Sequence, residues 1–307
     1  MRPKAKERKG DLFGALAGPT LSRPRLRLLP LALSAVGALA VAVWLMWTAT
    51  SPPPTRPTSS PASAVTRPEA AASAVSTPEP SVPSGPRVAI VIDDLGLSLK
   101  AAETLLGIPQ PLTFAVLPKL THSREIAEAA AAAGRDVLLH LPMEPLDYPA
   151  KDPGPGAIFK SMTSEAMAEV LKEDLAAVPN AVGVNNHMGS RLTEDEEVMR
   201  LILTILKERR LFFLDSYTSP RSVVSEVARE LGIPTASRHI FLDHEPEGAD
   251  YVAAQMDRLV AVARRHGEAI GIGHPRPSTI AALQEHLPKL AEAGITVVPL
   301  STLISAR

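Results

Sequence analysis

Short apolar runs alternate with amphipathic stretches from Arg87 to the end of this 307-residue chain. The eight apolar runs predict strands, and they read RVAIVID, LTFAVLP, RDVLLHLP, AVGVNNH, LFFLDS, HIFLDH, AIGIGHP and ITVVPLS. The stretches between them predict helices over 98–107, 122–133, 164–178, 194–209, 221–231, 250–266 and 278–293. Strands that alternate with helices form βαβ units and a mostly parallel sheet. Seven or eight such repeats favour an α/β fold of the (β/α) barrel type, and a doubly wound open sheet is the alternative.

Six of the predicted strands end in a polar or titratable group. These groups are Asp93 with Asp94, His140, the run Asn185, Asn186 and His187, then Asp215, Asp243 with His244, and His274. The carboxyl ends of the strands carry the active site in parallel α/β folds, so this repetition predicts a functional site. The paired aspartates need compensation, because a buried carboxylate is costly without a counter-charge.

The types of residue at the strand ends indicate a divalent cation. Asp, His and Glu are ligands of ions such as Zn²⁺, and the chain has no cysteine, which excludes thiolate sites, disulfides and a cysteine nucleophile. A cation would neutralise one aspartate, while the other could take a proton from a metal-activated water. This combination is typical of metal-assisted hydrolysis. The net charge of −1 argues against a nucleic-acid partner.

The N-terminal part of the chain has a different composition. Residues 1–27 are basic, and 28–48 contain the uncharged run LLPLALSAVGALAVAVWLMW, which is long enough to span a bilayer as a helix. The positive-inside rule predicts a single-pass anchor in the inner (cytoplasmic) membrane with its N-terminus inside. A cleaved signal peptide is the alternative. Residues 49–86, rich in Pro, Ser and Ala, predict a disordered linker to a periplasmic or extracellular domain over 87–307.

Several strings in the domain resemble one family. IDDLG, TFAVLP, AAAGRDVLLHLPMEP, GVNNHMGSRLT, FLDSYT and IGHP, read together, resemble the divergent polysaccharide deacetylases, a branch of the carbohydrate esterase deacetylases. The resemblance extends from Arg87 to the C-terminus. It implies a distorted (β/α) barrel and metal-dependent hydrolysis of an acetyl group on a polysaccharide, with peptidoglycan as a candidate substrate.

The resemblance also implies roles for the acids and histidines. Asp93 matches the general base, and Asp94 matches a metal ligand. His140 matches the first of two histidines that the family places four residues apart, but Glu144 stands at the second position. The third ligand is therefore Glu144 or, if Glu144 is not a ligand, His187 or His274.

The remaining assignments depend on the same resemblance. Asp215 matches an acid that orients the base, and His274 matches the late histidine that protonates the leaving group. The family's Arg-x-Pro-aromatic string is absent, and Arg191 could replace its arginine. Asn185 and Asn186 suit either sugar hydroxyls or a metal.

These substitutions leave two classes of function open. The first is an envelope-anchored, metal-dependent deacetylase, with zinc as the expected ion. The second is a catalytically inactive glycan-binding or scaffold protein that keeps the fold. Sugar-binding proteins usually line their grooves with Trp and Tyr, and the domain has no Trp and only Tyr148, Tyr217 and Tyr251, which favours the enzyme. A metal hydrolase of another bond is a third reading.

Overall fold

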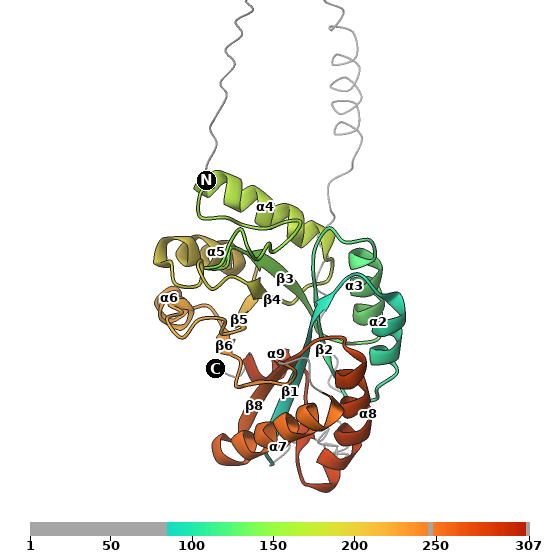
Figure 1. The fold of residues 1–307 in the computed structure, drawn as a ribbon. Helices are drawn as coiled ribbons and strands as arrows, with labels where there is room; N and C mark the ends of the chain where they lie inside the picture. Colours follow the sequence, from blue (N-terminus) through green and yellow to red (C-terminus); the bar gives the residue numbers. More distant parts are fainter. Residues whose placement is uncertain (1–84, 245–247, 305–307) are drawn as a thin grey trace, which may run out of the picture. The chain divides into compact units, whose positions relative to one another are not determined.

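The computed structural model describes residues 85–244 and 248–304 (Figure 1). The predicted basic tail over 1–27, the membrane span over 28–48 and nearly all of the linker over 49–86 lie outside the described residues. Those three assignments therefore stay predictions. Among the helices that are described, none is both long and apolar enough to cross a membrane.

The described strands form one nine-stranded sheet in which every pairing is parallel. Eight strands follow the order β6-β5-β4-β3-β2-β1-β8-β7, and β9 pairs with β1. Each of the eight predicted runs contributes a strand, and β6 is an additional one. The strands are β1 (Arg87–Leu95), β2 (Thr113–Val116), β3 (Val137–Met143), β4 (Gly183–Met188), β5 (Phe212–Asp215), β6 (Thr235–Ser237), β7 (Ile240–Phe241), β8 (Glu268–Gly273) and β9 (Thr296–Val297).

All seven predicted helices are present, and their ends lie within three residues of the predicted ones. Side chains of Ser98, Thr163 and Asp195 cap the helices that follow them, as their residue types favour. A short C-terminal helix was not predicted. The helices are α2 (Leu99–Leu106), α3 (Ser123–Ala132), α4 (Ser164–Ala177), α5 (Glu196–Glu208), α6 (Val224–Leu231), α7 (Ala249–His266), α8 (Pro277–Glu292) and α9 (Leu300–Ile304).

The sheet curls like a barrel, but no strand ladder closes it. Its end strands, β6 and β7, follow one another in the chain and share no ladder in the described structure. Two residues between them cross the gap: the backbone N–H of Arg238 donates to Asp215 O at 2.9 Å, and that of His239 donates to Ile270 O at 2.9 Å. The prediction of a parallel α/β fold is confirmed. The predicted distortion of the barrel corresponds to this gap between β6 and β7, which the chain crosses through Arg238 and His239.

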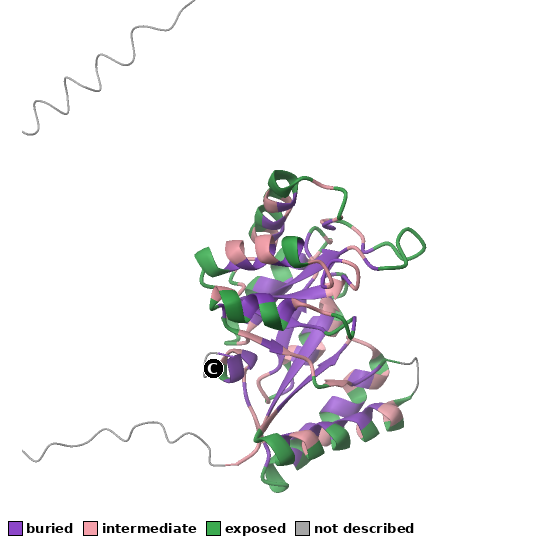
Figure 2. Cartoon of the chain, turned by 90° about the vertical axis from the view of Figure 1, so that its left-hand side faces the viewer, coloured by how far each residue is buried: buried purple, intermediate pink, exposed green. Residues whose placement is uncertain are grey.

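Alternate residues of β1 enter two apolar layers. Val88, Ile90 and Ile92 pack in the layer shared with the surrounding helices, whereas Ala89 and Val91 face the inside of the curl. Figure 2 shows the buried strands in the middle and helices whose outer faces are exposed. Strands buried on both faces read as continuous apolar runs, which is the pattern the sequence shows.

Helix α9 fills one end of the curl. Leu300, Leu303 and Ile304 belong to the inner apolar layer. Asp136, just before β3, accepts hydrogen bonds from the backbone N–H and hydroxyl of Ser301 at 2.7 and 3.1 Å. The amino ends of the strands are therefore covered, and the polar strand ends lie at the other end.

A carboxyl group on α4 is buried beside Lys119, which follows β2 in the chain. The side chain of Asp174 is fully buried, and its oxygens accept no hydrogen bond from the described residues. Its ion-pair partner is Lys119, whose Nζ lies 3.4 Å from Oδ1. Burial raises the pKa of Asp174 to about 7, although the charge of Lys119 opposes the shift.

We expect Asp174→Asn to gain stability over the wild type as the pH rises. Unfolded Asp174 ionises at its ordinary pKa of 3.8, whereas the folded group holds its proton until about pH 7. The free energy of unfolding of the wild type should therefore fall by roughly 2–4 kcal/mol at most across this interval and level off above it. Denaturant unfolding of both proteins at several pH values measures the difference.

Glu173→Gln is the matched control, because Glu173 is the exposed partner of the same lysine, 2.8 Å from Lys119 Nζ. Above about pH 5.5, where Glu173 is ionised in the folded and unfolded states alike, the stability of Glu173→Gln should run parallel to that of the wild type. A stability difference between Asp174→Asn and wild type that stays constant with pH would contradict the shifted pKa.

Candidate metal centre

Two adjacent carboxylates reach the polar end of the sheet because β1 is irregular there. Successive side chains of a regular strand point to opposite faces. The pairing of β1 with β2 shifts register between Ile92 and Leu95, and Asp94 has a φ of 56°. Such a bulge re-aims a side chain, and Asp tolerates the left-handed region better than most residues. Oxygens of Asp93 and Asp94 consequently lie 3.6 and 3.1 Å from Nε2 of His140.

Asp94, His140 and His187 bring three potential metal donors together from β1, β3 and β4. Asp94 Oδ1 lies 3.1 Å from His140 Nε2 and 2.8 Å from His187 Nδ1. The two ring nitrogens are 3.2 Å apart. We call these three residues the metal cluster.

The metal cluster fits a divalent cation. Zinc–ligand bonds of about 2.0–2.1 Å in tetrahedral geometry place two donors roughly 3.3 Å apart, close to the observed spacings. One carboxylate and two imidazoles are also a donor set that zinc accepts. The structure thus brings His187 to the position of third donor.

Asn185 orients His140 toward the cluster. Its Nδ2 donates to Asp93 Oδ1 at 2.8 Å and to Ser216 Oγ at 3.2 Å, so its Oδ1 is the atom that faces His140 Nδ1, at 2.9 Å. An amide oxygen only accepts, so Nδ1 of His140 carries the hydrogen. In the neutral ring, Nε2 is then left with its lone pair pointing at Asp94 and His187, as a metal ligand requires.

The cluster's ionisable groups perturb one another. Burial raises the pKa of Asp93. Burial opposes ionisation of Asp94 too, but hydrogen bonds and charge from His140 and His187 lower its pKa well below the ordinary value. Burial would lower the pKa of His140, and the two carboxylates raise it instead. Protons therefore compete with a cation for His140.

His274 faces the cluster from the end of β8 and is held by a buried acid. Its Nδ1 lies 2.8 Å from Asp243 Oδ1, and its backbone N–H donates to Oδ2 of the same carboxylate at 2.8 Å. Thr279 Oγ1 also donates to Asp243, at 2.6 Å. The other ring nitrogen of His274, Nε2, lies 3.6 Å from Asp94 Oδ2. Burial lowers the pKa of His274, but Asp243 and the two strand-end aspartates raise it above its usual value.

Asp215, predicted to orient the base, lies at the end of β5. Its carboxylate accepts hydrogen bonds from the backbone N–H of Tyr217 at 2.8 Å and from Ser222 Oγ at 2.7 Å, both in the loop that follows β5. The acid that contacts His274 is Asp243, which also ends an apolar run but had no assigned role. Hydrogen bonds thus tie Asp215 to its own loop, and its role in orienting the base stays a prediction.

Arg238 is a cationic neighbour of Asp93 that the sequence pattern did not indicate. Its Nε and Nη2 donate to the carbonyls of Ser216 and Tyr217 at 2.8 and 3.1 Å, and its guanidinium lies 4.7 Å from the ring centre of Phe241. Burial lowers the pKa of Arg238, and the charge of Asp93 opposes this shift. It lies in the segment that crosses the sheet gap, where no periodic pattern marks it.

Glu144 and Arg191 pair with each other rather than joining the metal cluster. Arg191 Nε lies 3.1 Å from Glu144 Oε1, and the backbone N–H of Lys160 donates to Glu144 Oε2 at 2.7 Å. These contacts hold the loop between β3 and α4 and leave Glu144 outside the metal cluster, and a substrate-binding role for Arg191 stays a prediction.

Asn185 and Asn186, predicted to bind sugar, use their amides within the protein. Asn186 Nδ2 donates to Met188 O at 2.7 Å, and its Oδ1 accepts the backbone N–H of Ser216 at 2.9 Å. Together with the bonds of Asn185, these contacts join the ends of β4 and β5. The geometry makes both asparagines supports of the cluster.

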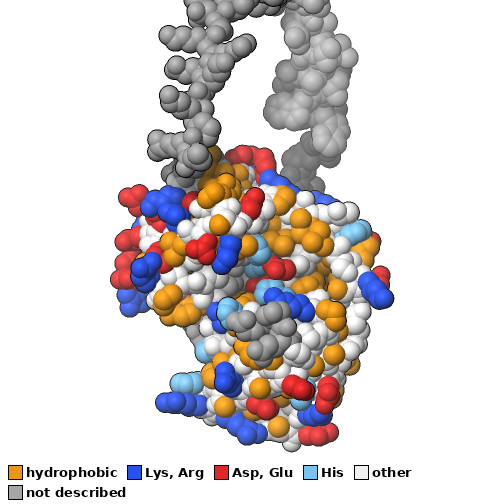
Figure 3. All heavy atoms as spheres, viewed as in Figure 1, with side chains coloured by type: hydrophobic (Ala, Val, Ile, Leu, Met, Phe, Trp, Pro, Cys, Tyr) orange, Lys and Arg blue, Asp and Glu red, His pale blue; other side chains and the backbone are white. Residues whose placement is uncertain are grey.

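The cluster opens into a cavity of about 550 Å³, which we call the polar cavity. Besides the cluster, its lining includes Asp93, Ser216, Thr218, Arg238 and His274. Figure 3 shows histidine and acidic side chains gathered near the middle of this face. Most of the strand-end side chains that the sequence singled out thus line one opening, whereas Asn185, Asp215 and Asp243 do not line it.

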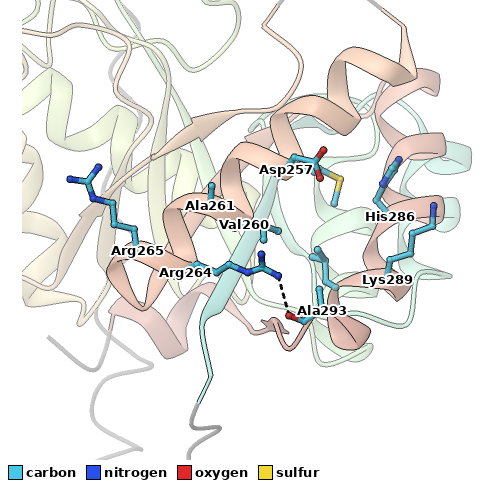
Figure 4. Close-up of a pocket in the computed structure, with 10 residues that line it drawn as sticks. Asp257, Val260, Ala261, Arg264, Arg265, His286, Lys289 and Ala293 are labelled. Atoms are coloured by element: carbon cyan, nitrogen blue, oxygen red, sulfur yellow. Dashed lines mark hydrogen bonds between the residues drawn. The ribbon is translucent and has the colours of Figure 1, made fainter.

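A second, larger groove of about 700 Å³ lies between α7 and α8, and it contains none of the cluster residues. Basic side chains from both helices border it, among them Arg264, Arg265 and Lys289 (Figure 4). Arg264 donates to Ala293 O at 3.4 Å. A metal-dependent reaction needs metal-ligand donors, and the groove between α7 and α8 contains none of the cluster residues. The smaller polar cavity is therefore the candidate site.

We expect His187→Gln to lose stoichiometric zinc and Glu144→Gln to retain it. His187 supplies one of three donors, and removal of even an outer partner of a metal site costs 10–100-fold in affinity, so the loss should exceed roughly 100-fold. Zinc titration of the purified full-length proteins, with circular dichroism as the folding control, measures this. Zinc lost from Glu144→Gln but kept by His187→Gln would assign the third ligand to Glu144.

Comparison with known proteins agrees with the fold. An uncharacterized protein of Haemophilus influenzae is 40% identical over 206 residues, 67% of this chain and 72% of that protein. The uncharacterized protein YibQ of Escherichia coli is 37% identical over 220 residues, 71% of this chain and 67% of that protein. A crystal structure of an uncharacterized Agrobacterium tumefaciens protein, 28% identical, superposes with a TM-score of 0.69 and covers 72% of this chain and 89% of its own. Residues 90–304 match the family described as divergent polysaccharide deacetylase, and this chain therefore belongs to that family.

Proposed function

We propose that this protein is a metal-dependent hydrolase that removes acetyl groups from a polysaccharide of the cell envelope, with peptidoglycan as a candidate. Membership of the family supports the reaction class. The observation that carries the proposal is the placement of a buried acid and a paired histidine beside the metal cluster. Asp93 Oδ2 lies 3.6 Å from His140 Nε2, and His274 Nε2 lies 3.6 Å from Asp94 Oδ2.

Asp94, His140 and His187 would hold the ion, for which we propose zinc. When bound, the ion supplies Lewis-acid activation of the scissile carbonyl and of the attacking water. Asp93 accepts the proton of that water, because its carboxylate borders the polar cavity but is not one of the clustered donors. Asn185 fixes the carboxylate through Oδ1, which leaves Oδ2 toward the cavity.

His274 donates the proton that lets the amine or alcohol leave. Its Nδ1 is bonded to the Asp243 carboxylate, so the Nε2 hydrogen of the protonated ring is the one that faces the cavity. Asp243 also stabilises the positive ring and fixes its orientation, as a buried acid beside a catalytic histidine does. The proton given up by water to Asp93 is thus matched by one supplied from His274.

We place the domain outside the cytoplasmic membrane on a single N-terminal anchor. The uncharged run within 28–48 and the basic residues before it support this orientation, and the composition of 49–86 supports a linker. Envelope polysaccharides are then the glycans within reach of the polar cavity. A catalytically inactive glycan binder is the reading that a failed hydrolysis assay would favour.

Asp93→Asn should keep the fold and bind zinc but lose roughly 10²–10⁴-fold in the rate of acetate release, the usual contribution of a general base. The amide has nearly the same shape and cannot accept the proton. Acetate release from acetylated chito-oligosaccharides and peptidoglycan fragments is the assay. Equal release by wild type and Asp93→Asn, at any rate, would remove the catalytic assignment.

Asp243→Asn should lower the rate by roughly tenfold or more, since the neutral amide neither stabilises the imidazolium nor fixes its orientation. Asp215→Asn is the matched comparison, because Asp215 is equally a buried strand-end acid but contacts its own loop. Folded Asp215→Asn should keep its rate even if its melting temperature falls. The reverse ranking of the two rates would restore Asp215 as the residue that supports catalysis.

A further inference from the structure

An apolar groove of about 550 Å³ lies beside the metal cluster and is lined by residues of both α2 and α8. We call it the α2–α8 groove. Its apolar lining comes from the two helices and the loops that precede them, and consists chiefly of Leu97, Ala101, Pro275, Pro277, Ile280 and Ala281.

The α2–α8 groove is linked to the site by residues that both share. Asp94 lines the groove and the polar cavity alike. The loop that joins β8 to α8 also serves both: His274 and Arg276 line the cavity, whereas Pro275 and Pro277 line the groove. A substrate whose carbonyl reached the metal cluster would therefore meet both openings.

Leu97 is the most strongly exposed large apolar side chain described, at 67%. The residues before and after Leu97 in the chain both restrict its backbone. Gly96 has a φ of 137°, and a Cβ there would lie 3.0 Å from Leu120, so this backbone is closely packed. Ser98 caps α2 by accepting the N–H of Ala101 at 3.2 Å. The loop thus holds a leucine at the groove instead of burying it in the core.

The two openings differ in chemistry. The polar cavity carries Ser216, Tyr217 and Thr218, whose hydroxyl groups suit a sugar. In the α2–α8 groove the wall is mostly aliphatic, and removal of apolar surface from water is favourable there. An acyl sugar has the same division, with a polyol on one side of its carbonyl and a hydrocarbon on the other.

We propose that the α2–α8 groove binds the aliphatic chain of an acyl group longer than acetyl. The proposal rests on the proposed hydrolase function and extends its substrate from acetyl to longer acyl amides or esters of a sugar. Water adds to the acyl carbon, the C–N or C–O bond breaks, and the proton lost by water is balanced by the one given to the leaving amine or alcohol. The released carboxylate keeps its chain in the groove.

The test is binding of sodium acetate, butyrate and hexanoate to the zinc-loaded full-length protein in lipid nanodiscs, measured by calorimetry against empty nanodiscs. Each buried CH₂ tightens binding by about fourfold, so hexanoate should bind at least roughly tenfold more tightly than acetate. Ala281→Trp should abolish this dependence on chain length, because Ala281 is exposed and lines the groove. Ala129→Trp, at an exposed position of α3, is the matched control and should keep it.

Hydrolysis of N-acetyl- and N-hexanoyl-glucosamine oligomers separates this proposal from the function on which it rests. Binding that tightens with chain length, and loses this trend in Ala281→Trp, supports the groove even if neither substrate is hydrolysed, in which case the hydrolase function fails. Affinities that do not change with chain length, or that change equally in wild type and Ala281→Trp, overturn the groove proposal. Release of acetate would then leave the hydrolase function standing.

Discussion

The site depends on two adjacent carboxylates at the end of β1, of which Asp93 is buried and Asp94 is partly exposed. Ionised carboxylates in a protein interior cost several kcal/mol each unless charges and hydrogen bonds compensate them. The bulge turns both toward one opening, and their compensation then comes from separate strands: Asn185 for Asp93, and His140 with His187 for Asp94. A divalent cation would offset the charge that remains. The same two acids that make this end of the sheet costly to fold therefore help to form a cluster that could hold a cation.

One end of the curled sheet is packed with apolar side chains that stabilise the fold, and the other end carries the polar side chains of the candidate site. Helix α9 fills the amino end of the curl with apolar side chains, which leaves the carboxyl end free to carry polar ones. At that end the hydrogen bonds of Asn185, Asn186 and Asp243 are made within the protein. These three side chains position neighbours that bear the proposed chemistry. Substitution of one of these three side chains should therefore displace a neighbouring reactive side chain without removing it.

Much of this architecture could be predicted from periodicity, because strands buried on both faces are continuous apolar runs whose polar ends stand out. The choice between Glu144 and His187 could not, since it depends on the ion pair that Arg191 makes with Glu144 across two loops. Asp215 and Asp243 both end apolar runs, and only the packing of the chain beside β8 decides which of them meets the histidine. The periodicity of the sequence identifies candidate side chains, but contacts between residues far apart in the chain determine which partners they have.

One divalent ion is expected between the acid and the two histidines of the metal cluster. A crystal of the full-length protein equilibrated with zinc, and measured at the zinc absorption edge, tests it directly. We expect a single strong anomalous peak within bonding distance of Asp94 Oδ1, His140 Nε2 and His187 Nδ1, at about 2.0–2.2 Å. An occupied site at Glu144, or an absence of any peak beside Asp94 at saturating zinc, would contradict the account.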